Sequence, residues 1–313
     1  MVEKSLAELR ALIAGAVGRE KAVDRLLLSV VDAPTPPMST LATPTFALVA
    51  QGRKRLAVGD QVFEYGAGDY LVVSVDLPVT GHFVEATPER PCLGVGLELR
   101  PDLIAALLLD AADNQTPGAP VQGLTVSKAP GELVDAVIRL LRLVDVPEDA
   151  RVLGPLVERE ILWRLLRSPQ GAAVREIGLA DSSLSHVARV IRWIRDHYTE
   201  PFRVEELAAM AGMSTSAFHR HFRTVTAMTP IQFQKKIRLQ EARLRLVGLG
   251  EDVTTAGYAV GYDSPSQFSR EYRREFGTPP SRDTGRVRDE ALGRIVQVAD
   301  SNDLSLPRQS RVY

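Results

Sequence analysis

Two stretches of the chain decide its fold: LAAMAGMSTSAFHRHFRTVTAMTP at residues 207–230 and AGYAVGYDSPSQFSREYRREFGTPP at residues 256–280. With one residue inserted at the turn, five alternate positions correspond: Ser214, Ser216, Phe218, Arg220 and Phe222 fall on Ser264, Ser266, Phe268, Arg270 and Tyr272. The turn glycines Gly212 and Gly261 correspond as well. A match this regular indicates that one structural unit has been duplicated.

Each copy has the pattern of a helix, a short turn with glycine, and a second helix. The turn glycine suits a positive φ, and Ser214 in one copy and Asp263 or Ser264 in the other can cap the next helix. Apolar residues three and four positions apart predict a buried stripe on each second helix. These stripes are Phe218, Phe222 and Val225, and Phe268, Tyr272 and Phe276. The sequence therefore predicts two helix-turn-helix units.

The opposite face of each second helix carries polar and basic side chains, which we predict to bind DNA. They are Ser216, His219, Arg220 and Arg223 in the first copy, and Ser266, Gln267, Ser269, Arg270 and Arg273 in the second. Arg220 and Arg270 are placed to contact guanine with two hydrogen bonds. Contact with phosphates is predicted for the neighbouring basic residues Arg223, Lys235, Lys236, Arg273 and Arg274. A solvated surface arginine is the plainer alternative at Arg220 and Arg270.

Charge is divided unevenly along the chain. Residues 186–288 carry 17 basic against 11 acidic side chains, a net charge of +6, whereas residues 1–185 carry 18 against 24, or −6. Neutralising phosphates releases condensed counterions, so the basic half is where a nucleic acid would bind. Between the two copies, residues 231–247 predict an amphipathic helix that Gly248 and Gly250 end. Such a helix can hold the two reading helices about 34 Å apart, one turn of double-stranded DNA.

Residues 186 to about 282 resemble the DNA-binding domain of the AraC/XylS family. The resemblance rests on both repeats, on RVIRWIRDHYTEPFRVEEL at residues 189–207 and on the linker KKIRLQEARLRL at residues 235–246. It implies transcription regulation, with RNA polymerase as a further partner. The chain departs from the family pattern at Pro280-Ser281-Arg282, which lacks the usual aromatic residue, and at Thr255-Ala256-Gly257, which is less apolar than usual.

The amino-terminal half has a different pattern. Residues 5–30 have helical periodicity, and short Val-, Leu- and aromatic-rich segments between residues 45 and 99 are separated by Gly, Pro and Asp, which predicts a small β-barrel or sandwich. Val58-Gly59-Asp60-Gln61 predicts a tight hairpin. Helical segments follow at residues 101–113, 131–144 and 153–168. The string PTFALVAQGRKRLAVGDQVFEYGAGDYLVVSVDLPVTG, residues 44–81, is similar to the cupin-like N-terminal domain of one subgroup of AraC-type regulators.

We therefore predict an α+β protein of two domains. A cupin-like β-barrel with flanking helices, a sensor and dimerisation domain, occupies residues 1–168, and a linker occupies 169–183. An all-α AraC-type DNA-binding domain, two helix-turn-helix units joined by a linker helix, occupies 184–285, and 286–313 form a disordered tail. The resemblance implies a small-molecule effector in the barrel and a homodimer, formed here by the helices of residues 130–167.

Four residues are candidates for lining an effector pocket in the barrel: Phe63, Tyr65, Tyr70 and His82. An ordinary barrel core explains the three aromatic residues equally well. Trp163 and Trp193 lie in apolar periodic segments and are predicted to be core residues.

Several functional classes lack support in the sequence. One barrel histidine, His82, with Glu85 is too few for a metal site of three or four ligands, and the single Cys92 is predicted to be a buried thiol. No phosphate loop or catalytic triad is recognisable, and no apolar run reaches the ~18 residues of a membrane span. We predict no metal, cofactor, catalytic residue or membrane association, and a cytoplasmic location. Two alternatives stay open: a cupin-type metal enzyme fused to a DNA-binding unit, and an effector-independent regulator acting through protein contacts.

Overall fold

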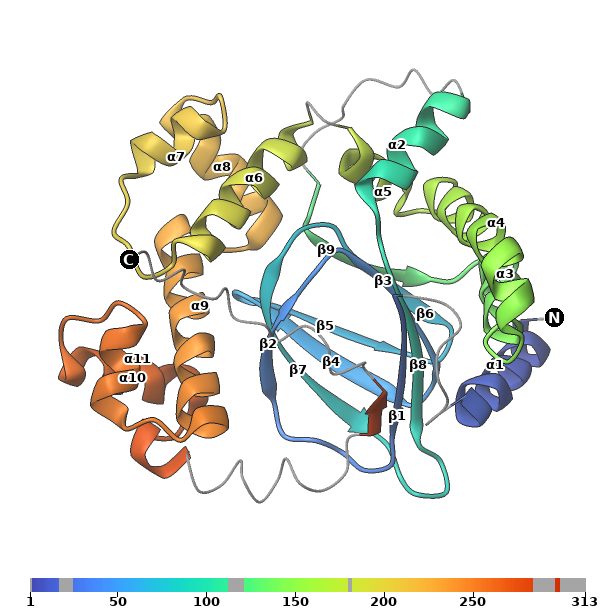
Figure 1. The fold of residues 1–313 in the computed structure, drawn as a ribbon, viewed down its shortest axis with the longest axis horizontal. Helices are drawn as coiled ribbons and strands as arrows, with labels where there is room; N and C mark the ends of the chain where they lie inside the picture. Colours follow the sequence, from blue (N-terminus) through green and yellow to red (C-terminus); the bar gives the residue numbers. More distant parts are fainter. Residues whose placement is uncertain (1, 17–24, 112–120, 180–181, 284–295, 299–313) are drawn as a thin grey trace, which may run out of the picture.

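Two antiparallel sheets form the centre of the protein, and helices flank them on both sides (Figure 1). The computed structural model describes residues 2–16, 25–111, 121–179, 182–283 and 296–298. The first sheet has the order β10-β1-β8-β3-β6-β9 and the second the order β2-β7-β4-β5. The strands are β1 Leu26–Val31, β2 Met38–Ala42, β3 Thr45–Gln51, β4 Arg53–Val58, β5 Gln61–Gly66, β6 Asp69–Val73, β7 Leu77–Glu85, β8 Cys92–Glu98, β9 Leu124–Lys128 and β10 Val296–Val298. We call β1–β9 the β domain.

The predicted hairpin is confirmed, whereas the long first helix is not. Strands β4 and β5 pair with Val58 opposite Gln61, and Gly59 has a φ of +59°. Helix α1 covers only Val2–Ala16, and Leu26–Val31 is strand β1. The run LLLSVV is apolar over several positions, and a run of that length fits a buried strand as well as a helix segment.

The first sheet separates two apolar clusters, because successive side chains of a strand point to opposite faces. On one face, Phe46, Leu48, Tyr70 and Val72 pack against helices. The helices on that side are α1, α2 Pro101–Asp110, α3 Gly131–Arg142, α4 Pro147–Leu166 and α5 Gly171–Gly178. On the other face, residues such as Val49, Leu71 and Val73 meet the second sheet, and we call this the inner cluster. Helix α5 lies in the segment predicted as a linker.

The inner cluster continues into the first helix-turn-helix unit. The helices of the carboxyl-terminal half are α6 Ser183–Asp196, α7 Val204–Met210, α8 Thr215–Thr226, α9 Pro230–Leu244, a π-helical turn Arg245–Leu249, α10 Val253–Ala259 and α11 Pro265–Phe276. Val58 and Leu77 of the β domain belong to the same buried cluster as Phe222 and Val225 of α8. The β domain and the first unit therefore share one core.

Polar contacts reinforce this junction. The Gly123 N–H donates to the Val225 carbonyl at 2.9 Å, and Gln240 Nε2 of α9 donates to the Thr40 carbonyl of β2 at 3.3 Å. Arg195 Nη1 of α6 lies 2.6 Å from Asp76 Oδ2. Backbone and side-chain bonds together tie α6, α8 and α9 to the β domain.

The second unit has a separate, smaller core. Tyr262, Phe268 and Tyr272 are buried with Leu239 and Leu246, and this cluster does not include residues of the β domain among those the structure describes. In Figure 1, α9 runs from the first unit to the α10–α11 pair.

Two further expectations concern the edges of the molecule. Trp163 of α4 is 38% exposed, so its prediction as a core residue is wrong, whereas Trp193 packs against the inner cluster. Of the predicted disordered tail, the structure describes Val296–Val298, which pairs with β1 as strand β10. The rest of residues 286–313 lies outside the described residues.

Candidate nucleic-acid interface

Helix α8 is held in place by its cap and its aromatic stripe. The Ser214 hydroxyl accepts a hydrogen bond from the Ala217 N–H at 3.3 Å, as the sequence predicts for an N-cap. Phe218 and Phe222 are fully buried, and the Phe222 ring meets Phe233 of α9 edge to face at 5.6 Å between centroids. Gly212 turns the chain with a φ of +65°. The inward face of α8 is therefore fixed, and the outward face is left for contact.

The predicted reading residues of α8 share that outward face. Ser216, His219, Arg220 and Arg223 are all exposed. Neither arginine has a side-chain hydrogen bond or an ion pair within the described part of the chain. The neighbouring His221 is half-buried, and both burial and the adjacent Arg220 charge lower its pKa. His221 therefore favours the neutral form and packs, whereas His219 faces solvent.

Helix α11 repeats this arrangement. The Ser264 hydroxyl accepts from the Gln267 N–H at 3.3 Å, which assigns the cap to Ser264 rather than Asp263. Phe268 and Tyr272 are fully buried. Of the predicted reading residues, Ser266, Gln267, Arg270 and Arg273 are exposed, and Ser269 is half-buried.

Three polar groups near α11 are already engaged with one another. Gln267 Nε2 donates to Glu271 Oε1 at 3.2 Å, and Lys235 Nζ of α9 lies 2.7 Å from the same oxygen. Lys236 lies 2.5 Å from Glu275. Burial raises the pKa of Glu271, but hydrogen bonds from Lys235 and other donors outweigh it and lower the pKa overall. Both lysines thus join α9 to α11, where the sequence suggested phosphate contacts.

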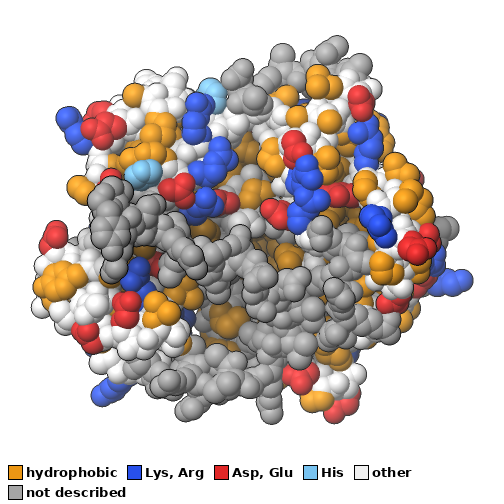
Figure 2. Space-filling model, viewed as in Figure 1, with side chains coloured by type: hydrophobic (Ala, Val, Ile, Leu, Met, Phe, Trp, Pro, Cys, Tyr) orange, Lys and Arg blue, Asp and Glu red, His pale blue; other side chains and the backbone are white. Residues whose placement is uncertain are grey.

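On the face that Figure 2 shows, basic and acidic side chains are interspersed over the helices on both flanks. The positive excess of residues 186–288 is therefore not gathered into one patch in this view. The exposed arginines of α8 and α11 nevertheless occupy equivalent positions in the two repeated units.

The structure separates the four candidate effector-pocket residues. Phe63 and Tyr65 belong to the inner cluster, and burial raises the pKa of Tyr65. Tyr70 instead points to the helices, where its hydroxyl donates to Ser168 Oγ at 2.8 Å. His82 alternates with the buried Phe83 along β7, which places it on the outer face of the second sheet. Tyr70 and His82 therefore do not face the inner cluster with Phe63 and Tyr65, and a role of these four residues in binding an effector stays a prediction.

Sequence reasoning missed one polar residue that adjoins the inner cluster through Phe83. Lys54 shares strand parity with the buried Leu56 and Val58 of β4, and its Nζ lies 4.9 Å from the centroid of the Phe83 ring. Burial lowers the pKa of the Lys54 ammonium. The alternation of Lys54, Leu56 and Val58 was the available signal.

A pocket lies at the junction of the β domain with α6. The sequence had not predicted a pocket there. Its volume is about 550 Å³, and it is formed by the segment after β6, α2, α5 and α6. Asp76, Glu176, Arg189 and Arg192 are among its lining residues.

Cys92 is buried, as the sequence predicts. Burial raises the pKa of its thiol to about 11, so the thiol stays protonated at neutral pH.

A metal site or a membrane-spanning helix would be recognisable within the ranges that the structure describes. In those ranges no three His, Cys, Asp or Glu side chains gather where they could hold a metal ion. The described helices include none with the length and apolar character to cross a membrane.

Family models match both halves of the chain. The model described as the AraC-type transcriptional regulator N-terminus matches residues 22–173, and a helix-turn-helix domain model matches residues 207–285. The first range covers β1–β9 and helices α2 to α4, and the second runs from within α7 through α11.

Curated relatives are transcriptional activators. The chain is 31% identical over 140 residues to the HTH-type transcriptional activator RhaS of Klebsiella pneumoniae (strain 342), covering 44% of this chain and 49% of the relative. It is 30% identical over 162 residues to RhaS of Escherichia fergusonii, covering 51% of this chain and 55% of the relative. The chain thus spans about half the length of the curated relatives it matches.

Solved structures of ToxT from Vibrio cholerae share the fold. One crystal form gives a TM-score of 0.54 at 9% identity, covering 88% of this chain and 100% of that chain. ToxT of strain SCE256 with a bound unsaturated fatty acid gives 0.51 at 11% identity, covering 84% and 95%. At these identities the likeness concerns the arrangement of the β domain and the helices.

Proposed function

Because this chain belongs to the AraC family of transcriptional regulators, we propose that it is a sequence-specific DNA-binding regulator that reads DNA with α8 and α11. One observation carries the proposal. Arg220 and Arg270 occupy equivalent positions on two duplicated helices, both are exposed, and neither has an ion pair within the described residues. A single helix, α9, joins the two units, so both reading helices can engage one duplex.

Selection of bound sequences from a random DNA pool, followed by substitution, tests this proposal. Arg220→Ala and Arg270→Ala are each expected to weaken binding to the selected DNA by about 1–3 kcal/mol and to relax base preference at one position. Each variant should affect a different half of the selected site. Arg90→Ala, an exposed arginine of the β domain, is the matched control and should leave binding unchanged. Unaltered affinity and base preference in both α8 and α11 variants would refute the reading role.

A small-molecule effector is the second part of the proposal. The junction pocket has a volume of about 550 Å³, within the roughly 300–1,000 Å³ typical of ligand sites. Since it is lined from both the β domain and α6, a bound molecule would contact both. The fatty acid in the ToxT structure suggests a first probe. Oleate should raise the unfolding temperature of the protein and change its affinity for the selected DNA. A reporter gene then shows whether transcription rises, as the names of the activator relatives suggest. If oleate and a wider panel of small acids change neither property, the effector is refuted.

We further propose a homodimer that forms through α4. Val152, Leu156 and Trp163 lie on one exposed side of this helix at spacings of four and seven residues, and an exposed apolar stripe of this kind is typical of an interaction surface. Light scattering on the whole chain should give twice the monomer mass, and a monomer mass at micromolar concentration would contradict this assignment.

Contact with RNA polymerase and a cytoplasmic site of action are also part of the proposal. Their support is the family resemblance alone.

A further inference from the structure

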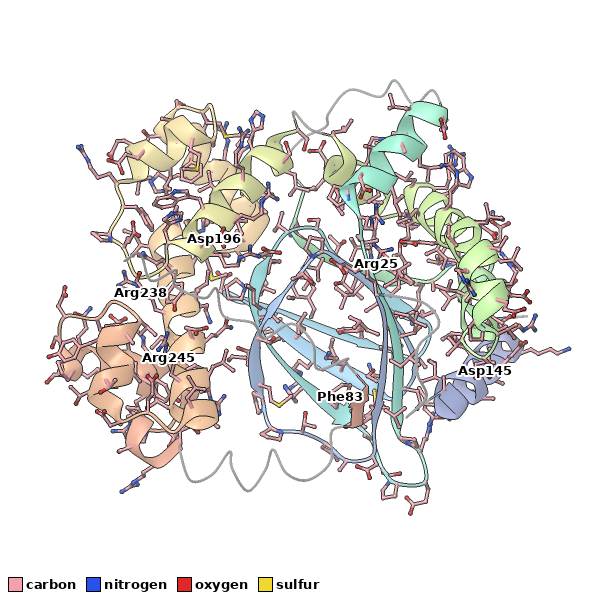
Figure 3. The ribbon with its side chains drawn as sticks, viewed as in Figure 1. Arg25, Phe83, Asp145, Asp196, Arg238 and Arg245 are labelled. Atoms are coloured by element: carbon pink, nitrogen blue, oxygen red, sulfur yellow. The ribbon has the colours of Figure 1, made fainter. Side chains whose placement is uncertain are left out.

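Arg238 of α9 bridges the two helix-turn-helix units. Its Nε donates to the Tyr198 carbonyl at 2.6 Å and its Nη2 to the Thr199 carbonyl at 3.1 Å, both in the segment between α6 and α7. Its Nη1 donates to the Gly261 carbonyl at 2.7 Å, in the turn of the second unit. Figure 3 places Arg238 at the level between the two units. One guanidinium thus holds backbone from the segment that leads into the first unit and from the turn of the second.

The chemistry of this contact requires arginine. A guanidinium presents five N–H donors in a rigid fork, whereas an ammonium offers three donors at a single point. The hydrogen-bond partners of Arg238 among the described residues, with the Glu200 carbonyl at 3.5 Å as the most distant, are all main-chain carbonyls, so the fork fixes the backbone itself. Burial lowers the pKa of Arg238, but a guanidinium keeps its charge under physiological conditions.

The turn glycine of the second unit completes the bridge. Gly261 has a φ of +86°, and a Cβ there would lie 2.5 Å from the Thr199 carbonyl oxygen. Gly212, its counterpart in the first unit, has a φ of +65° and nothing within 4 Å of an added Cβ. The two glycines serve the same local turn, but only Gly261 also permits direct backbone approach between the units.

Gln234 strengthens the same attachment from one side. Its side chain is buried, and Nε2 donates to the Tyr198 carbonyl at 3.0 Å and to the Glu200 carbonyl at 2.6 Å. Gln234 therefore binds α9 to the first unit only, whereas Arg238 reaches both. Gly261 lies four residues before Pro265, the first residue of α11, so holding its carbonyl also holds the start of the reading helix.

We propose that Arg238 is a positioning residue that fixes the orientation of α11 relative to α8 and so sets the spacing between the two half-sites that the protein accepts. This inference rests on the proposed function, because spacing has meaning only if both helices read DNA. Without the bridge, α10 and α11 stay attached through the apolar cluster that they share with α9 and through the ion pairs of Lys235 and Lys236, but turn more freely about Gly250, whose φ is +70°.

The test measures binding of the full chain to the pool-selected DNA, to versions with one or two base pairs added or removed between the half-sites, and to each half-site alone. The variants are Arg238→Lys and Gly261→Ala, with Gly212→Ala as the matched control. For the unchanged protein, affinity should fall at least tenfold when the spacing changes. For Arg238→Lys and Gly261→Ala, affinity for the selected spacing should fall about tenfold, the penalty for altered spacing should shrink, and half-site affinity should stay the same.

Each outcome decides between positioning and other roles. If Arg238→Lys lowers half-site and full-site affinity equally, its role is general stability and the inference is overturned. An unchanged spacing profile in both Arg238→Lys and Gly261→Ala overturns it as well, even while Arg220 and Arg270 still govern base preference. If Gly261→Ala fails to fold, Arg238→Lys decides alone. A chain that selects no sequence from the pool refutes the proposed function instead, which keeps the two failures distinct.

Discussion

The two helix-turn-helix units have the same sequence pattern but different supports. Phe222 of the first unit lies in the inner cluster, together with residues of both sheets, whereas Phe268 of the second lies in a small cluster with α9 and α10. Polar bonds, including those of Arg238 and Lys235, make up much of the second unit's attachment. The two units thus present exposed arginines at equivalent positions, while the surroundings that support each helix differ.

This difference indicates how a signal from the β domain would travel. The turn at Gly59 approaches the first unit closely. A Cβ at Gly59 would lie 2.5 Å from the carbonyl oxygen of Ala227, the C-cap residue of α8. A shift in the β domain therefore acts on α8 directly. The second unit meets the rest of the molecule through α9 and through the approach of Gly261 to Thr199, so the bridge at Arg238 lies where a shift of α8 would reach α11.

The largest expected effect comes from removing the equivalent aromatic residues. Phe222→Ala and Phe268→Ala each empty a fully buried site, and a change of this type costs about 3–5 kcal/mol. Phe222→Ala should lower the free energy of unfolding of the β domain as well, because the core is shared. Phe268→Ala should unfold the second unit alone. Hydrogen exchange monitored segment by segment distinguishes them, and equal loss of protection in the β domain for both variants would contradict the comparison.

A smaller contrast is expected at the turn glycines. Gly212→Ala meets no neighbour, so its cost should be about 1 kcal/mol from the positive φ alone. Gly261→Ala also brings Cβ against the Thr199 carbonyl, which should raise the cost to about 2–3 kcal/mol. Urea unfolding followed by helical circular dichroism measures both. Equal costs would show that the second turn is free to move away from Thr199.

Sequence succeeded where the signal is local and failed where it depends on partners. The two units were predictable because the glycine turn, the Ser214 cap and the aromatic stripes all lie within short segments. Sequence did not predict that Tyr70 and His82 lie on other faces than Phe63 and Tyr65, because alternation does not say which strand face points inward, and a shift of one residue exchanges the faces. The pairing of Lys235 with Glu271 joins residues 36 positions apart, so composition alone suggested a free basic group.

The shared core of the β domain and the first unit was equally hidden. Val58 and Val225 are apolar residues in separate predicted domains, and each could have been assigned to the core of its own domain. Domain boundaries drawn from composition describe where the chain changes character. They carry no information about which surfaces meet, and here the meeting surface distinguishes the first unit from its repeat.

The smallest expected effect concerns the ion pair between Asp76 and Arg195 at this junction. Burial raises the pKa of Asp76, and the attraction of Arg195 only partly opposes it. The folded state therefore binds a proton more readily than the unfolded chain, so the contribution of Asp76 to stability becomes more favourable as pH falls through the raised pKa and levels off below the ordinary value. Asp76→Asn removes this pH dependence.

At neutral pH, Asp76→Asn should change the free energy of unfolding by less than about 1 kcal/mol, because the substitution removes the burial cost of the carboxylate together with the attraction of Arg195 that opposes part of it. Urea midpoints compared between about pH 4 and about pH 7 give the pH dependence of both proteins. A loss of several kcal/mol at neutral pH would mean that the ion pair, rather than the shared apolar core, holds the first unit on the β domain. In that case polar contacts would hold both units in place, and the contrast between the buried surroundings of Phe222 and Phe268 would matter less.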